Sequence, residues 1–181
     1  MASIIDVRGF HPKIGNDCFL AENATIIGDV VIGDRSSVWF QAVVRGDVHE
    51  IRIGNEVNIQ DGAIIHCTYE KAGTYIGDRV SIGHRAIVHG CKVHSDVLIG
   101  MGAIVMDNAV VESNVLIAAG AVVLENSHLE SGHIYGGIPA KKIKVLDPDT
   151  FQFFIDRTAK NYQLYSSWFT KYKKYFVVSI Q

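Results

Sequence analysis

Three histidines in the middle of this 181-residue chain have the type and spacing to bind a metal ion. His66, His84 and His89 lie in a segment, residues 44–94, that is otherwise rich in regularly spaced aliphatic residues. Neutral imidazole is a preferred ligand of zinc and related ions, and three such ligands leave a fourth position open for a reactant. Any one of these histidines could simply fill a polar position on a regular scaffold, so the hypothesis depends on the three together.

The elements that must position these histidines follow from a sequence repeat. An aliphatic residue recurs every six positions in four segments: 14–44, 53–65, 76–88 and 93–129. Between consecutive segments the spacing is six plus three residues, then six plus five, and finally six minus one. A period of six over more than a hundred residues fits neither an α-helix nor an alternating strand. It is typical of a parallel β-helix, in which each repeat is a short strand and a corner. We therefore predict a mainly β fold whose coils are triangular, with the aliphatic residues inside and glycines at tight corners.

The repeat ends near residues 135–144, where Pro139 and two glycines interrupt it. A helix is predicted next, because Asp147 is a good N-cap and Pro148 suits the first helical position. The expected organisation is a β-helix domain over 1–145 and a helix over 146–176 that packs on it, forming a single domain overall. One apolar stripe of this helix should be covered by the β-helix or by a neighbouring subunit: Phe151, Phe154, Ile155, Tyr162, Tyr165, Phe169 and Tyr172.

Counting repeats assigns the polar residues to faces of the triangle. Every third repeat lies on the same face, so Arg45, His66 and His89, which each follow an aliphatic repeat residue, should form one outward-pointing column. This count treats the extra residues as loops that leave the order of faces intact. His66 and His89 should then lie one coil apart, close enough to share one ion at zinc–nitrogen distances of ~2.0–2.1 Å.

The same count places Asp61 and His84 on a different face. His84 should therefore not reach the other two histidines within its own chain. A threefold trimer would bring the second face of one subunit against the first face of the next. The predicted site is then His66 and His89 from one chain with His84 from its neighbour, and Arg45 faces Asp61 across the same seam. Metal binding and assembly would be coupled.

Several short motifs resemble those of the γ-class carbonic anhydrases and their close relatives: RGD at 45–47, NIQDG at 58–62, and the three histidines. The resemblance covers roughly residues 10–172. The six-residue repeat alone is weak evidence, because acyltransferases share it, whereas the histidines together with RGD and QDG are specific. The resemblance implies a left-handed β-helix, a homotrimer, and His66, His84 and His89 as ligands of zinc, with iron or cobalt as alternatives.

The resemblance also implies a metal-dependent lyase that reversibly hydrates CO2 to bicarbonate, because a site of this kind lowers the pKa of a bound water to about 7 and so supplies a hydroxide nucleophile. Gln60 resembles the residue that orients the bound water or the product. Arg45 and Asp61 resemble an intersubunit ion pair, and Asp47 belongs to the same network. Tyr162 resembles a helix tyrosine that many relatives place near the metal, although it could equally be a plain residue of the apolar stripe.

The insertion after His66 departs from the family pattern. Well-studied members have an acidic loop with a glutamate that carries protons away, whereas residues 67–75 here read CTYEKAGTY, with Glu70 as the single acid. This departure predicts slow hydration or a catalytically silent protein. Glu70 is the candidate replacement for the missing glutamate, and a charged residue on a turn can also be merely solvated.

Two other functions stay open. An acyl-coenzyme A-dependent acyltransferase on the same coil would need one histidine as general base and a groove for its cofactor. A metal-binding family member with another role, for example thioesterase-like, would explain the missing glutamate.

The composition narrows the partners. A net charge of −2 and a pI of about 6.4 give no basic field for nucleic acid. The basic cluster near the end, Lys171, Lys173 and Lys174, is read as a solvated helix face. Neither a signal peptide nor a membrane span is evident, and three cysteines at irregular spacing indicate reduced thiols. We expect a cytoplasmic homotrimer that acts on CO2 and bicarbonate and binds neither nucleic acid nor membrane.

Overall fold

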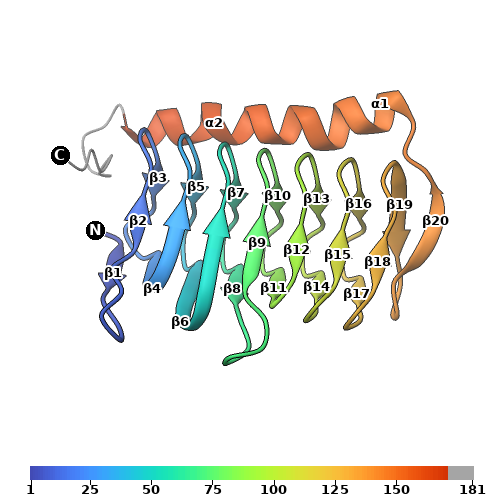
Figure 1. Ribbon diagram of the computed structural model, residues 1–181. Coiled ribbons are helices and arrows are strands. Elements are labelled where there is room, and N and C mark those ends of the chain that lie inside the picture. The colour runs from blue at the N-terminus through green and yellow to red at the C-terminus, as the bar shows by residue number, and fades with distance from the viewer. Residues whose placement is uncertain (171–181) are drawn as a thin grey trace.

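The structure is a computed structural model that describes residues 1–170. The chain winds into a triangular parallel β-helix, and one long helix lies along it from end to end (Figure 1). The predicted fold class is therefore confirmed. We name the three faces of the prism the histidine face, the helix face and the third face.

The histidine face carries both strands that end in a candidate ligand. It consists of the first parts of β4 (Thr25–Ile32) and β6 (Val43–Ile53), together with β1 (Ser3–Ile5), β8 (Ile64–His66), β11 (Ile87–His89), β14 (Ile104–Val105) and β17 (Val122–Val123).

The third face follows it along the chain. It consists of the second parts of β4 and β6, together with β2 (Lys13–Ile14), β9 (Thr74–Ile76), β12 (Lys92–Val93), β15 (Val110–Val111) and β18 (His128–Leu129). Because β4 and β6 continue around the corner between these two faces, their strands form one sheet of twelve.

The helix face is a separate sheet of eight strands. It consists of β3 (Phe19–Leu20), β5 (Ser37–Val38), β7 (Asn58–Ile59), β10 (Ser81–Ile82), β13 (Leu98–Ile99), β16 (Leu116–Ile117), β19 (His133–Gly136) and β20 (Lys141–Val145), of which only β20 is antiparallel to its neighbour.

The six-residue repeat sets the register of the coils. Val44 pairs with Ile65, and Ile65 pairs with Val88, so the aliphatic residues stack in one column across both insertions. All three side chains are fully buried. Removing these apolar side chains from water stabilises the stack of coils. The first insertion is not a loop, however. It lies inside β6, where the register with β4 jumps from Gly28–Gly46 to Val30–Ile51 as a bulge.

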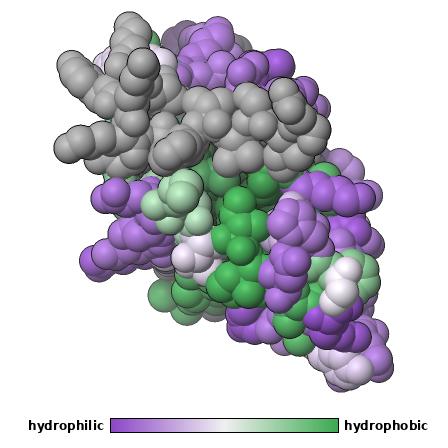
Figure 2. All heavy atoms as spheres, turned by 90° about the vertical axis from the view of Figure 1, so that its left-hand side faces the viewer, coloured by the Kyte–Doolittle hydropathy of each residue, from purple (hydrophilic) through white to green (hydrophobic). Residues whose placement is uncertain are grey.

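The prism is apolar inside and polar around its rim. Figure 2 looks along the prism from the end at which the N-terminus lies; green apolar residues gather at the centre and purple polar residues surround them. The inward-facing aliphatic residues of successive coils form one continuous cluster, so the interior is a packed core rather than a channel.

The C-terminal helix has three parts: α1 (Pro148–Thr150), the π-helical segment η1 (Phe151–Asp156) and α2 (Arg157–Thr170). Asp147 is the N-cap, as predicted, and its side chain accepts a hydrogen bond from the backbone N of Thr150 at 2.8 Å. Phe154, expected in the covered stripe, is not covered by the prism of its own chain, whereas Ile155 is fully buried. A π-turn holds more residues than an α-turn, so it shifts which side chains face the prism.

The helix contacts the helix face of the prism at both of its ends. Near its C-terminal end, the ring of Trp39 lies 5.2 Å from that of Tyr162 and 5.6 Å from that of Phe169. In its first turns, Asp156 accepts a hydrogen bond from Arg79 at 2.9 Å. The predicted helix end at 176, Tyr172 and the three lysines of the basic cluster lie outside the described residues. Within residues 1–170, no helix is both long and apolar enough to cross a membrane.

Candidate metal centre

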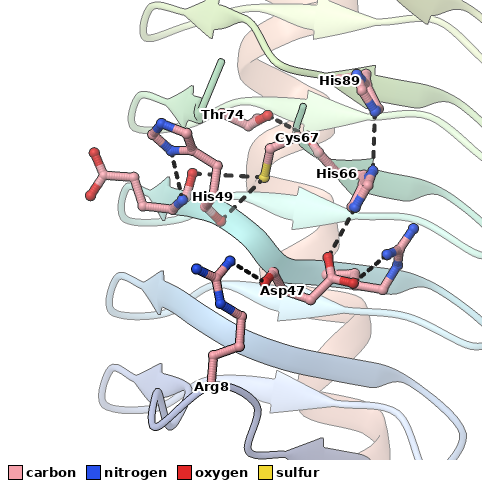
Figure 3. Close-up of polar contacts among 9 residues, drawn as sticks. Arg8, Asp47, His49, His66, Cys67, Thr74 and His89 are labelled. Carbon is pink, nitrogen blue, oxygen red and sulfur yellow. Dashed lines mark hydrogen bonds and ion pairs between the residues drawn. The ribbon is translucent and has the colours of Figure 1, made fainter. Parts of the chain in front are cut away.

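His66 and His89 lie side by side at the ends of β8 and β11. Their backbones are in register, and Nδ1 of His66 is 3.1 Å from Nε2 of His89 (Figure 3). Their side chains are only 17% and 26% exposed. Burial lowers the pKa of His66, so this ring is neutral at neutral pH. The structure thus brings these two predicted ligands together.

Asp47 lies behind the ring of His66. Its Oδ1 is 3.0 Å from Nε2 of His66, and its Oδ2 accepts a hydrogen bond from Arg45 at 2.5 Å. Partial burial raises the pKa of Asp47, but the hydrogen bonds from Arg45 and His66 outweigh it, and the pKa lies below its ordinary value. Asp47 is therefore ionised and can only accept hydrogen bonds.

Asp107 lies behind the ring of His89 in the same manner, and the sequence analysis missed it. One carboxylate oxygen contacts Nδ1 of His89, and the other accepts a hydrogen bond from the hydroxyl of Thr68. Burial opposes ionisation of this carboxyl as well, but the hydrogen bonds from Thr68 and His89 hold its pKa below the ordinary value.

The facing nitrogens of this pair fit a metal cation. Because both carboxylates only accept, the outer nitrogen of each ring must carry the hydrogen, and a neutral ring then has a lone pair on its inner nitrogen. When both rings are neutral, two such lone pairs face each other across 3.1 Å. That separation is less than twice the ~2.0–2.1 Å of a zinc–imidazole bond, so one ion could bind both rings.

His84 belongs to a second cluster, at the corner between the helix face and the histidine face. Its Nδ1 is 2.8 Å from Oδ2 of Asp61, and its Nε2 is 3.4 Å from the hydroxyl of Tyr162. The His84 and Asp61 side chains are each 42% exposed. Burial, and then the charge of Asp61, raises the pKa of Tyr162 to about 12, so its phenol stays protonated.

Gln60 lies beneath this corner, in the coil before His84. Its backbone N donates to the carbonyl of Ile82 at 2.9 Å, and its side-chain amide donates to Asn58 at 3.0 Å. Asn58 in turn donates to Ser81, so the amide of Gln60 is held in a buried polar chain.

The two clusters do not meet within one chain. Among residues 1–170, no three histidine, cysteine, aspartate or glutamate side chains form a group that could hold a metal ion. Arg45 and Asp61, the predicted intersubunit pair, each contact a partner of their own chain, Asp47 and His84 respectively. A three-histidine site therefore needs a second chain, and it stays a prediction.

A cavity of about 270 Å³ opens beside Asp47. Its walls include both His49 and Glu70, the single acid of the insertion after His66. Glu70 itself is exposed on the turn that follows Thr68. Asp47 and Glu70 therefore border the same cavity.

Comparison with known proteins identifies the family. The family model for bacterial transferase hexapeptide (six repeats) matches residues 11–46 and 90–125. "Gamma carbonic anhydrase 2, mitochondrial" of Arabidopsis thaliana is 40% identical over 165 residues, which cover 88% of this chain and 59% of that protein. A carbonic anhydrase of Geobacillus kaustophilus is 48% identical over 146 residues, which cover 81% of this chain and 80% of that one. The chain belongs to the γ-carbonic anhydrase-like family of hexapeptide-repeat proteins.

A solved structure that resembles this γ-carbonic anhydrase-like chain is described as an acetyltransferase. The crystal structure of a proposed acetyltransferase from Bacillus cereus superposes with a TM-score of 0.91 at 34% identity, covering 94% of this chain and 98% of that one. The chain spans only about 59% of the length of the Arabidopsis relative. The family is thus shown, and the reaction is a matter for proposal.

Proposed function

We propose that this γ-carbonic anhydrase-like protein is a metal-dependent enzyme that reversibly hydrates CO2 to bicarbonate. The observation that carries the proposal is the pair of inner ring nitrogens, 3.1 Å apart, with an ionised carboxylate behind each ring. Such carboxylate–histidine pairs are the usual second layer of a catalytic metal site. Zinc is the proposed ion, with iron or cobalt as alternatives, and the ion would supply a Lewis acid that activates water at neutral pH.

The third ligand is proposed to be His84 of a neighbouring chain in a homotrimer. The surface around the histidine pair supports such a contact. Ile64 on β8 and Leu124 after β17 are 41% and 52% exposed on the histidine face, and Met101 is 58% exposed on the corner that stacks on His84. A neighbouring subunit that covered these apolar side chains would remove them from water, which is favourable.

The remaining side chains have proposed roles that follow from their contacts. Asp47 fixes the ring of His66, and Arg45 holds Asp47 in place and presents positive charge at the surface where bicarbonate would leave. Gln60, held in its buried chain, would orient the reacting water or the product from the His84 side. Tyr162 would donate a hydrogen bond to substrate, since its phenol stays protonated and lies 3.4 Å from Nε2 of His84, the nitrogen that would bind the metal.

Hydration releases a proton that must reach solvent. Glu70 is the proposed carrier, because it lines the same cavity as Asp47 and is itself exposed. A carboxylate exchanges protons readily with buffer, and general acid–base groups of this kind accelerate proton transfer substantially. The expected cytoplasmic location stays a prediction, since the Arabidopsis relative is named mitochondrial.

An acyl-coenzyme A-dependent acyltransferase is the second candidate, favoured by the Bacillus cereus structure. That reaction needs one histidine as base and leaves the other two of the three histidines, and the QDG motif, unexplained. Binding of acetyl-coenzyme A by a protein that contains no stoichiometric metal would favour it. A metal-binding member with a thioesterase-like role would instead contain metal and fail to hydrate CO2.

The test combines metal analysis with kinetics. Protein purified without a histidine tag should contain one zinc, iron or cobalt ion per chain and have the mass of a trimer. Stopped-flow measurements should then detect CO2 hydration above background in the metal-loaded protein and background hydration alone in His84→Ala. Equal rates for the two proteins would sink the hydration proposal.

A further inference from the structure

Asp107 makes two contacts that together leave its carboxylate little freedom. One oxygen accepts a hydrogen bond from Nδ1 of His89, and the other accepts one from the hydroxyl of Thr68, which belongs to the insertion after His66. The side chain is only 16% exposed. Each oxygen thus has a donor on a different coil.

The backbone around His89 is shaped to admit this carboxylate. Gly90 has a φ of +54°, and a Cβ placed on it would lie 2.5 Å from Oδ1 of Asp107. Any larger residue at position 90 would push the carboxylate away from the ring, besides being strained at a positive φ. Gly90 is also held by a hydrogen bond from its N to the hydroxyl of Thr74 at 2.9 Å.

The contact decides which nitrogen of His89 can bind a metal. An ionised carboxylate accepts a hydrogen bond, so it selects the tautomer of His89 that carries hydrogen on Nδ1. The lone pair is then on Nε2, which is the nitrogen that faces His66 across 3.1 Å. In the other tautomer, Nε2 would carry hydrogen and could not act as a ligand.

We propose that Asp107 is the positioning residue that fixes His89 in its metal-binding tautomer, and that Thr68 and Gly90 hold the carboxylate of Asp107 in place. This inference rests on the proposed metal centre and adds to it a residue that lies outside the RGD and QDG motifs. Groups behind a metal-binding histidine typically change metal affinity by about 10–100-fold.

The sharpest variant is Asp107→Asn, which has the same shape. The amide can keep the hydrogen bond donated by Thr68 only through its oxygen, and that orientation turns its nitrogen, a donor, toward Nδ1 of His89. The matched control is Glu112→Gln, because Glu112 makes the same kind of contact, 3.0 Å from Nε2 of His128, on the third face. Thr68→Val is a second variant, which removes only the hydroxyl.

The first readout needs no metal and no activity. Nitrogen NMR of the metal-free trimer should show His89 with hydrogen on Nδ1 in the wild type and in Glu112→Gln, and on Nε2 in Asp107→Asn. The second readout is cobalt affinity, measured by competition with a chelator. It should fall about 10–100-fold in Asp107→Asn, by less in Thr68→Val, and not at all in Glu112→Gln.

If Asp107→Asn binds cobalt as tightly as the wild type does, the inference is overturned. A loss of affinity with the tautomer of His89 unchanged would overturn it as well, because Asp107 would then act on the fold rather than on the ring. CO2 hydration by the wild type separates this inference from the proposed function. A trimer that binds cobalt through His89 but does not hydrate CO2 refutes the reaction and leaves the role of Asp107 intact.

Discussion

The two halves of the candidate centre differ in how much of their geometry one chain supplies. His66 and His89 are half-buried on adjacent strands, and each outer ring nitrogen meets a carboxylate. His84 also contacts a carboxylate, that of Asp61, but both side chains are 42% exposed at a corner. The first half is thus pre-organised by the stacking of coils, whereas in the proposed trimer the second half would acquire its final surroundings only when the neighbouring subunit covers it.

This difference teaches where binding energy would be spent. Ordering a side chain costs conformational entropy. For the histidine pair, the side chains are already ordered in the folded chain. In the proposed trimer, the side chain of His84 would be ordered only when the subunits associate, so its entropy cost would reduce the free energy of association. A split site of this kind makes metal affinity depend on assembly.

Removing a histidine from either half should abolish the centre, with different effects on the fold. We expect His89→Ala and His84→Ala each to lower metal affinity and hydration by more than about 100-fold, since residues behind the ligands alone contribute about 10–100-fold. In metal-free protein, His89→Ala should lower the free energy of unfolding by about 1–3 kcal/mol, because it leaves the carboxylate of Asp107 without one donor. His84→Ala should change it by less than about 0.5 kcal/mol. Urea unfolding of both variants checks this, and equal destabilisation would remove the distinction between the halves.

The next effect concerns proton release beside the histidine pair. Glu70→Gln should lower the turnover number about tenfold or more in weak buffer, because the proton loses its carrier. Imidazole buffer should restore the rate by carrying the proton instead. Glu22→Gln, on an exposed turn elsewhere, is the control. A rate that is independent of both Glu70 and buffer would show that protons leave by another route.

A smaller effect is expected on the His84 side. Tyr162→Phe removes a hydroxyl that lies 3.4 Å from His84 and leaves the ring packed on Trp39. Neutral hydrogen bonds contribute about 0.5–1.5 kcal/mol, so kcat/KM should fall by a factor of about 2–12. A loss beyond 100-fold would mean that the phenol takes part in the chemistry.

The smallest effect should appear only in acid and concerns the helix that carries Tyr162. Hydrogen bonds from Lys160 and Arg79 lower the pKa of Asp156 to about 2. Because the folded pKa is lowered, this carboxylate stabilises the fold fully above the ordinary aspartate pKa of about 4, and the contribution is lost as the pH falls toward about 2. Urea unfolding at a series of pH values should show that Asp156→Asn lacks this acid-dependent loss and that Asp149→Asn retains it. Parallel curves for the wild type and Asp156→Asn would contradict the assignment.

The sequence predicted the fold and the histidine pair because a strict period determines which residues stack. Counting in sixes put His66 beside His89, and the backbone register agrees. The same counting could not find Asp107. The register sets Val105 beside Val88, so Met106 follows in the column of His89, and the carboxylate of Asp107 reaches back from the corner.

Two further features lie outside any period. Thr68 belongs to the insertion, which has no repeat to align it with Asp107. The π-helical segment turns Phe154 outward, because its turn is set by packing of the helix rather than by the spacing of apolar residues. The repeat count put His84 on a different face from the histidine pair. Its proposed place against a neighbouring chain stays a prediction, because a repeat count orders residues only within one prism.

The most direct test mixes two inactive variants. His84→Ala lacks the ligand that one chain would give to its neighbour, and His89→Ala lacks a ligand of the pair, so trimers of either variant alone should bind no stoichiometric metal. When equal amounts are unfolded and reassembled together, about one seam in four should combine an intact pair with an intact His84, because subunits of a cyclic trimer contact head to tail. The account predicts recovery of about a quarter of the wild-type metal content and hydration rate; a mixture of trimers that stays free of metal and inactive would contradict it.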